Sequence, residues 1–316
     1  MTAPWIRLVA VAATLALLVW QVGTGPFLDG LRAVDAEALL AASGLAVLTT
    51  VCCAWRWRTV ARGLGAELPL ATAVAAYYRS LFLNLTLPGG VLGDVHRGLG
   101  HGLRAVAWER TAGQAVQAVL TVAVLLVLPS PVRPLMPYAA LALLAAAVAV
   151  GLAARVRPAV GGSRWARLRS AAARDLRDAL LARRAWPAIA LASALVVAGH
   201  AATFLIAARS AGVTAPPSQM LPLALLVMQA AALPNIGGWG PREGVTAWAF
   251  AAAGLGPSLG VATAVVYGVM VFVASLPGAV VLAAAWVYRT RPASWLRRPH
   301  LSRLGGPAHL DGAPDV

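Results

Sequence analysis

The stretch 233–244 combines helix-breaking residues with two charges inside an apolar region. It reads L-P-N-I-G-G-W-G-P-R-E-G, and apolar segments flank it on both sides. An intact helix does not run through prolines and glycines at this density. Arg242 and Glu243 follow the break directly. Irregular backbone and charge at membrane depth are costly unless they are buried in protein or line a wet cavity. The stretch therefore predicts a broken-helix site inside a membrane protein.

A second stretch repeats this combination earlier in the chain. Residues 82–97 read F-L-N-L-T-L-P-G-G-V-L-G-D-V-H-R, so that Asp94 and Arg97 follow a Leu-Pro and several glycines. The tripeptide W-E-R at 108–110 brings Glu109 and Arg110 to the start of an apolar run. Two interpretations stay open for these four charges. They form a ligand site, or they lie at the cytoplasmic surface (Asp94 and Arg97) and at a helix start (Glu109 and Arg110).

Arginine beside a break favours the binding of phosphate. Its planar guanidinium donates two parallel hydrogen bonds, and a helix N-terminus after the break adds partial positive charge. We therefore predict that Arg242 binds a lipid phosphate while Glu243 orients it or titrates in a proton-coupled cycle. The alternative is an ion pair that only holds the tip of the break.

Other chemistry finds little support in the sequence. His200 is a lone imidazole on an apolar helix, which favours a hydrogen-bonded packing residue over a proton relay. We find no spacing typical of a metal site, a phosphate-binding loop, a dinucleotide fingerprint or a nucleophile motif. We therefore expect no cofactor, no metal and no catalytic residue.

Composition places these residues in a membrane protein. Of the 316 residues, 60% are hydrophobic and 12% are charged. A net charge of +15 would suggest nucleic acid in a soluble protein. Here the arginines gather in loops beside apolar spans, where membrane topology and anionic headgroups explain them better. We therefore expect no nucleic-acid partner.

Six apolar segments are long enough to cross a bilayer at about 1.5 Å per residue. They are residues 5–22, 38–54, 111–128, 135–154, 185–208 and 259–287. Residues 70–88 are also apolar but include Arg79, and an arginine in mid-span costs about 2.5–3.5 kcal/mol. The predicted fold class is therefore an all-α polytopic membrane protein with six full transmembrane helices plus two re-entrant or broken segments. Residues 1–289 would form the membrane domain and 290–316 a disordered cytoplasmic tail.

The distribution of arginine orients these spans. The W-R-W-R cluster at 55–58, the nine arginines of the basic loop 155–184 and the arginine-rich tail all face the cytoplasm if both broken segments are re-entrant. Both termini are then cytoplasmic. The order span, span, broken segment, span occurs twice in opposite orientation, and such an inverted repeat is typical of secondary transporters.

At these motifs the sequence resembles the transmembrane region of the lysylphosphatidylglycerol synthase/flippase family, over roughly residues 5–290. The resemblance rests on residues 82–97, on W-E-R and above all on residues 233–244. It implies a polytopic bacterial or archaeal domain that moves aminoacylated, other anionic or polyprenyl-linked lipids between leaflets. The positions implied for the substrate are Asn84, Asp94, Arg97, Glu109, Arg110, Arg242 and Glu243, and those implied for the breaks are Pro88, Gly93, Pro234, Gly238, Gly240 and Gly244.

Three hypotheses of function follow. The first is a flippase-type lipid transporter of the bacterial cytoplasmic membrane, in which arginines guide an anionic headgroup while the acyl tails stay in lipid. The second is a membrane transferase with Asp94 or Glu243 as base. The third is a non-transporting accessory subunit of an envelope lipid pathway. Fused family members add a soluble aminoacyl-transferase domain, and because this chain ends soon after its last span, we expect no lysyl transfer and no enzyme. The expected partner is a phospholipid or polyprenyl-linked lipid, with a homo-oligomer or a partner enzyme of the pathway left open.

Overall fold

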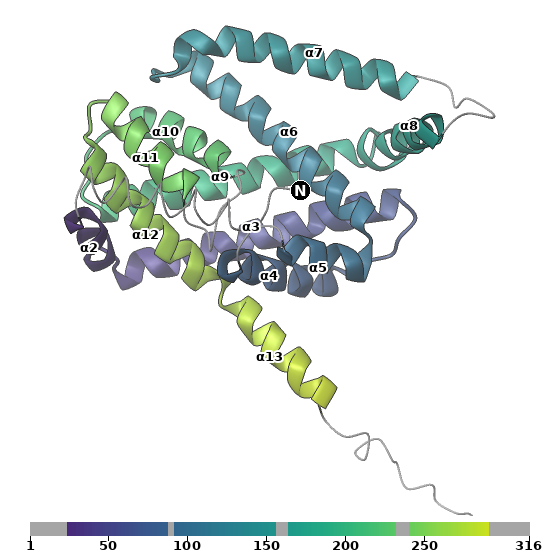
Figure 1. Ribbon diagram of the computed structural model, residues 1–316, viewed down its shortest axis with the longest axis horizontal. Coiled ribbons are helices and arrows are strands. Elements are labelled where there is room, and N and C mark those ends of the chain that lie inside the picture. The colour runs from purple at the N-terminus through teal and green to yellow at the C-terminus, as the bar shows by residue number, and fades with distance from the viewer. Residues whose placement is uncertain (1–23, 88–91, 156–163, 232–239, 291–316) are drawn as a thin grey trace, which may run out of the picture.

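The computed structural model describes residues 24–87, 92–155, 164–231 and 240–290, and these ranges form a helical bundle without a strand (Figure 1). The helices are α2 (Gly25–Arg32), α3 (Ala36–Gly63), α4 (Leu70–Thr86), α5 (Leu92–His101), α6 (Leu103–Val127), α7 (Met136–Arg155), α8 (Arg164–Asp175), α9 (Trp186–Ser210), α10 (Pro217–Ala230), α11 (Pro241–Ala252), α12 (Pro257–Ser275) and α13 (Pro277–Thr290). A 3₁₀ turn, η1 (Arg133–Leu135), precedes α7, and a π-helical turn, η2 (Leu176–Leu180), follows α8.

Five helical segments of the described ranges are long and apolar enough to cross a membrane. They are Ala36–Gly63, Leu103–Val127, Arg133–Arg155, Trp186–Ser210 and Pro257–Val287. These segments confirm the predicted all-helical membrane protein. The first predicted span, 5–22, and the predicted tail, apart from Thr290, lie outside the described residues, so the count of six spans stays a prediction.

Several helices extend beyond the predicted spans. α3 continues through the W-R-W-R cluster, and α6 begins at Leu103, well before the predicted 111. The predicted last span is divided into α12 and α13 at Pro277. A proline has no backbone N–H to donate and its ring crowds the preceding turn, so a helix breaks there.

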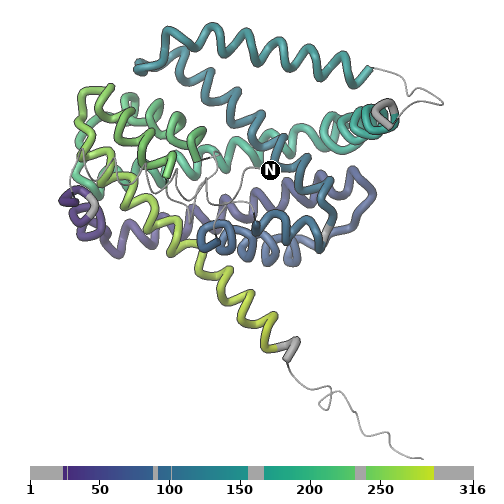
Figure 2. Tube along the Cα trace, in the orientation of Figure 1, coloured from purple at the N-terminus to yellow at the C-terminus, as the bar shows by residue number. Residues whose placement is uncertain are grey.

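Helices α3–α6 and α9–α12 make the same set of contacts. Within each half the four helices pack in sequence, and the first also packs on the fourth. Between the halves α3 crosses α9, and α12 contacts α3 and α4 just as α6 contacts α9 and α10. Figure 2 separates the halves by colour, with α3–α6 in purple to blue and α9–α12 in teal to yellow-green. Equivalent helices of the two halves therefore meet equivalent neighbours.

Both predicted broken segments are pairs of short helices that pack on each other. α4 and α5 have 17 and 10 residues, and α10 and α11 have 14 and 12. A helix needs about 20 residues to cross the hydrocarbon core. Helices α5, α10 and α11 are therefore too short to span a bilayer alone, and α4 lies at the lower limit.

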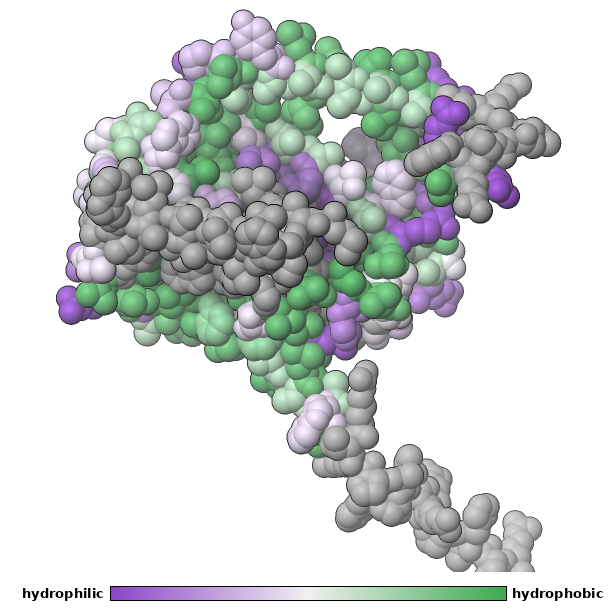
Figure 3. All heavy atoms as spheres, viewed as in Figure 1, coloured by the Kyte–Doolittle hydropathy of each residue, from purple (hydrophilic) through white to green (hydrophobic). Residues whose placement is uncertain are grey.

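Helix α7 stands apart from the bundle and exposes apolar side chains. Its most apolar stretch has no buried residue, and hydrophobic residues cover the outer face of the helix (Figure 3). Lipid tails are as apolar as leucine, so such a surface is stable in a membrane.

The crossing of α3 and α9 depends on a glycine. A Cβ atom added to Gly199 would overlap the methyl group of Thr49. Further along α9, the Phe204 ring packs on the rings of Phe250 of α11 and Tyr267 of α12, with centroid separations of 6.4 and 5.8 Å. Helix α9 therefore packs on α3 at the crossing and on the core of the second half through Phe204.

We expect Gly199→Ala to lower the melting temperature of the protein in detergent. The added methyl group would force α3 and α9 apart, and such overpacking costs about 1–3 kcal/mol. Gly44→Ala on α3 is the control, because a Cβ atom there meets nothing within 4 Å. The control should be neutral or gain about 0.5–1 kcal/mol of helix stability. Equal melting temperatures for the two variants would contradict the close crossing.

Candidate functional site

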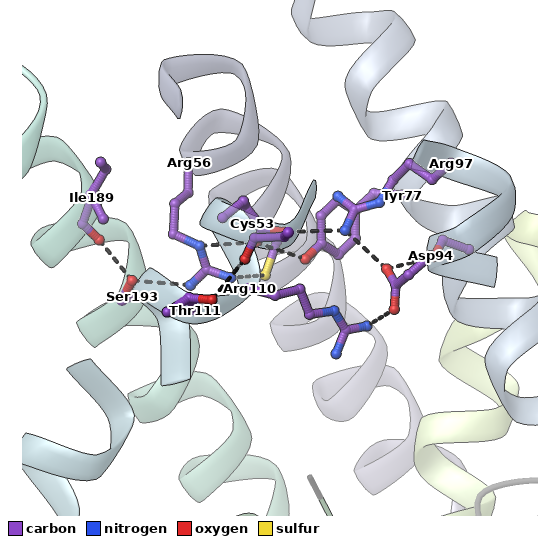
Figure 4. A network of polar contacts seen from close by, with 12 residues as sticks. Cys53, Arg56, Tyr77, Asp94, Arg97, Arg110, Thr111, Ile189 and Ser193 are labelled. Carbon is purple, nitrogen blue, oxygen red and sulfur yellow. Dashed lines mark hydrogen bonds and ion pairs between the residues drawn. The ribbon is translucent and has the colours of Figure 1, made fainter. Parts of the chain in front are cut away.

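Glu109 bonds to side chains from α3, α4 and α5 within a buried cluster of charged and polar groups. Figure 4 shows other members of this cluster, among them Arg56, Tyr77 and Arg97. We call Arg56, Tyr77, Asp94, Arg97, Glu109 and Arg110 the Glu109 cluster. Oε1 of Glu109 accepts hydrogen bonds from Arg56 Nε at 3.0 Å, from Arg56 Nη2 at 2.5 Å and from the Tyr77 hydroxyl at 3.1 Å. Oε2 accepts one from Arg97 Nη2 at 3.1 Å. A carboxylate that is 0% exposed is tolerated only with such pairing.

Arg97 is held between two aromatic rings. Its guanidinium carbon lies 4.4 Å from the ring centroid of Trp57 and 4.1 Å from that of Tyr77. This cation–π contact replaces part of the lost hydration. Nη2 also donates to Asp94 Oδ1 at 2.9 Å. Nε and Nη1 of Arg97 have no hydrogen-bond partner among the described residues.

Asp94 connects the two helices of the first broken segment. Its carboxylate accepts hydrogen bonds from Ser80 Oγ and Asn84 Nδ2 of α4, both at 3.0 Å, and pairs with Arg110 of α6. The Asn84 side-chain oxygen accepts from the Gly93 backbone N–H at 2.8 Å. A Cβ atom on Gly93 would overlap the Ser80 carbonyl, so α4 and α5 can approach this closely only with glycine there.

The Glu109 cluster carries more positive than negative charge. Three arginines face two carboxylates, so one positive charge is not balanced by the carboxylates of the cluster itself. Arg110 is the accessible member, with 42% of its side chain exposed, and its Nε has no partner among the described residues. A guanidinium in this position can bind a phosphate or carboxylate group.

Arg242 and Glu243 form a separate ion pair at the start of α11. Arg242 donates from Nε and Nη2 to Glu243 Oε1, at 2.9 and 2.5 Å. Glu243 Oε2 accepts from the backbone N–H of Gly240 at 2.7 Å, which caps the helix, and Gly240 has a φ of 127° that favours glycine. Gly244 lies in the first turn of α11. The Arg242–Glu243 pair therefore caps α11, the preceding break lies outside the described residues, and the phosphate contact of Arg242 stays a prediction.

A mostly apolar cavity lies between α3, α4, α9 and α12 and borders the Glu109 cluster at Tyr77. Its walls include Tyr77 of the Glu109 cluster and His200. His200 Nδ1 lies 3.3 Å from the hydroxyl of Tyr267, so the predicted hydrogen bond is present. The Tyr267 ring in turn faces the Arg242 guanidinium at 5.3 Å.

The structure brings five of the predicted site residues together, namely Asn84, Asp94, Arg97, Glu109 and Arg110. Asp94 and Arg97 are only 7% and 0% exposed, so neither is a solvated surface charge, and their predicted position at the cytoplasmic side stays a prediction. The helix-start alternative for Glu109 and Arg110 is wrong, because α6 begins a full turn earlier. The predicted break residues Pro88, Pro234 and Gly238 lie outside the described residues.

Sequence reasoning missed three members of this region: Arg56, Trp57 and Tyr77. Arg56 and Trp57 of the W-R-W-R cluster are buried in the protein, at 6% and 0% exposed, and the cytoplasmic interface predicted from this cluster stays a prediction. Arg56 is stable inside because Glu109 pairs with it and Ser193 accepts its third hydrogen bond at 3.0 Å. Gly113, one helical turn after Glu109, was a sequence signal that another side chain approaches α6 closely here. In the structure a Cβ atom at this position would come within 2.7 Å of the Arg56 guanidinium.

The first residue of W-E-R connects α6 to the basic helix α8. Trp108 Nε1 donates to Asp175 Oδ2 at 3.0 Å, and Arg104 pairs with the same carboxylate. All three residues of W-E-R therefore hold neighbouring helices, since Glu109 and Arg110 belong to the Glu109 cluster.

Comparison with known proteins agrees with the resemblance seen in the motifs. The family described as "Lysylphosphatidylglycerol synthase TM region" matches residues 5–278. This range contains both helix pairs, the Glu109 cluster and the Arg242–Glu243 pair. Among curated proteins, none matches the chain.

We expect Glu109→Ala to destabilise the protein by about 3–5 kcal/mol, because it leaves Arg56 and Arg97 buried without their carboxylate. Thermal unfolding in detergent measures the loss. Glu67→Ala is the control, because Glu67 is exposed and such surface changes stay within about 0.5 kcal/mol. A loss of less than about 1 kcal/mol in Glu109→Ala would mean that the cluster is not the main support of the first half.

The contact of α6 with α8 should weaken only in acid. Burial acts to raise the pKa of the Asp175 carboxyl, but hydrogen bonds from Arg104 and Trp108 outweigh it, so the pKa lies below its ordinary value. A carboxyl with a lowered folded-state pKa contributes stability that is complete above its unfolded value of about 3.9 and is lost as the pH falls through the folded-state value. Wild type should therefore melt above Asp175→Asn at pH 6, and the two should converge as the pH falls below the ordinary range of an aspartate and through the folded-state pKa. A difference that persists unchanged in acid would contradict this linkage.

Proposed function

The chain belongs to the family of the lysylphosphatidylglycerol synthase TM region, and on this basis we propose that it moves an anionic lipid between the leaflets of a membrane. The observation that carries the proposal is the unbalanced positive charge of the Glu109 cluster. Ionisable residues at membrane depth are costly and generally mark a pathway for a ligand or an ion.

A lipid phosphate fits the cluster chemically. Arg56 and Arg97 are fixed by Glu109, and the Arg110 side chain is 42% exposed. A phosphate oxygen at Arg110 would neutralise the excess charge through a charge-assisted hydrogen bond. In this proposal Arg110 binds the headgroup, Asp94 orients Arg110, and Glu109 keeps the other two arginines in place.

Arg242 provides the corresponding group in the second half. It lies in the first turn of α11, where the helix dipole adds partial positive charge. Its pair with Glu243 engages Nε and Nη2. A second anion contact at Arg242 would place one headgroup site in each repeat.

The paired contacts of the two halves support alternating access. Two repeats with broken helices between them are the usual architecture of a secondary transporter. We propose six spans with both termini in the cytoplasm, the basic loop 155–184 on the same side, and two re-entrant helix pairs entering from opposite faces. Rearrangement of one half against the other would expose the headgroup site to each leaflet in turn. The bacterial cytoplasmic membrane, with its anionic lipids, suits the basic loop.

Lipid transfer in proteoliposomes tests the proposal. We expect Arg110→Gln and Arg242→Gln each to slow the transfer of fluorescent phosphatidylglycerol by about tenfold, because a hydrogen bond to a charged group contributes about 1.5–3 kcal/mol. Arg62→Gln, at the exposed end of α3, is the control.

Phosphatidylcholine, which has no net charge, should be transferred more slowly than phosphatidylglycerol by the wild type. Equal rates for wild type and both site variants would refute the headgroup role of these arginines. A covalently changed lipid, detected by mass spectrometry and lost in Glu243→Gln, would instead favour a transferase.

A further inference from the structure

The α4–α12 and α6–α10 interfaces between the two halves occupy equivalent places but differ in the side chains that line them. The contact of α4 with α12 corresponds to that of α10 with α6, because exchange of the two halves turns one pair into the other. The first interface borders the apolar cavity, with Leu81 and Leu85 of α4 facing Met270 and Ala274 of α12. The second is joined by side-chain hydrogen bonds.

Two glutamines make these hydrogen bonds. Gln117 of α6 donates through Nε2 to the carbonyl oxygen of Met228 on α10, at 3.2 Å. Gln229 of α10 donates through Nε2 to the hydroxyl of Thr121 on α6, at 2.7 Å. Each helix therefore contributes one donor and one acceptor, and the two bonds lie about one helical turn apart on α6.

The strength of these bonds suits an interface that opens and closes. Interhelical hydrogen bonds between polar side chains in membranes are individually weak, because the separated helices find other partners. A pair of them can hold one arrangement without making it permanent. Ser275 of α12, in the wall of the cavity, instead donates to the carbonyl oxygen of Phe272 on its own helix, at 2.7 Å.

We propose that the Gln117–Met228 and Gln229–Thr121 hydrogen bonds are a gate between the two repeats, closed in this structure. When the gate opens, a cavity forms between α6 and α10 while the cavity between α4 and α12 closes. The two states use the same set of helix contacts with the halves exchanged, so a small energy separates them and a ligand shifts their populations. This inference rests on the proposed lipid transport. It assigns control of which side is open to the residues of these two hydrogen bonds.

Cross-linking tests the gate in the full-length protein. The native cysteines are first removed by Cys52→Ala and Cys53→Ala. Thr121→Cys and Gln229→Cys are then introduced and joined with a short bis-methanethiosulfonate. Transfer of fluorescent phosphatidylglycerol is measured by albumin extraction from vesicles of phosphatidylcholine and phosphatidylglycerol. We expect linked protein to transfer lipid at least about tenfold more slowly, because it cannot leave one state, and reduction of the linker to restore transfer.

A matched pair controls for the cross-linker. Gln219 of α10 donates to the carbonyl oxygen of Ala253, just beyond α11, at 3.3 Å, which is the same kind of bond within a single helix pair. Gln219→Cys with Ala253→Cys should transfer lipid equally with and without the linker. Unchanged transfer in the linked Thr121–Gln229 pair would overturn the gate.

A second measurement does not depend on transport. Thr121 is only 4% exposed, so Thr121→Cys should react slowly with a water-soluble maleimide. Gln117→Leu should speed this reaction about tenfold, since labelling follows the open population, whereas Gln219→Leu should not. Faster labelling without any lipid transfer would retain the gate and reject the proposed function. Equal labelling in both glutamine variants would reject the gate.

Discussion

The first half of the bundle depends on the pairing of Glu109 with Arg56 and Arg97. A carboxylate and two guanidinium groups leave water together, and each is acceptable inside only because the other two are there. Since these residues come from α6, α3 and α5, the pairing sets how three helices meet. The aromatic rings of Trp57 and Tyr77 then close the space around Arg97. Other contacts of this region follow from that geometry.

Helix type and membrane character could be predicted from the sequence, because apolar length and glycine–proline breaks are local signals. The motif residues Asp94, Arg97 and Glu109 could also be named in advance. Their pairing could not, because Arg56 lies 53 positions from Glu109 and stood in a basic cluster typical of an interface. Local sequence places a charge on a helix but does not say which distant side chain neutralises it.

The repeat was visible as an order of elements before any contact was known. The contacts between α3–α6 and α9–α12 give that order a physical meaning, because equivalent helices meet equivalent neighbours. The two charge sites nevertheless differ. The first is a six-residue cluster across four helices, whereas Arg242 and Glu243 are neighbours in sequence that cap one helix. Symmetry of backbone therefore coexists with unequal chemistry in the two halves.

The long separation of Arg56 from Glu109 also bears on how the chain is made. Synthesis proceeds from the N-terminus, so α3 reaches the membrane before α6 exists. An unpaired arginine in a span costs about 2.5–3.5 kcal/mol on insertion scales. Arg56 has no carboxylate partner at this position until Glu109 has been translated. Final burial of α3 is thus tied to the arrival of a helix that is translated later.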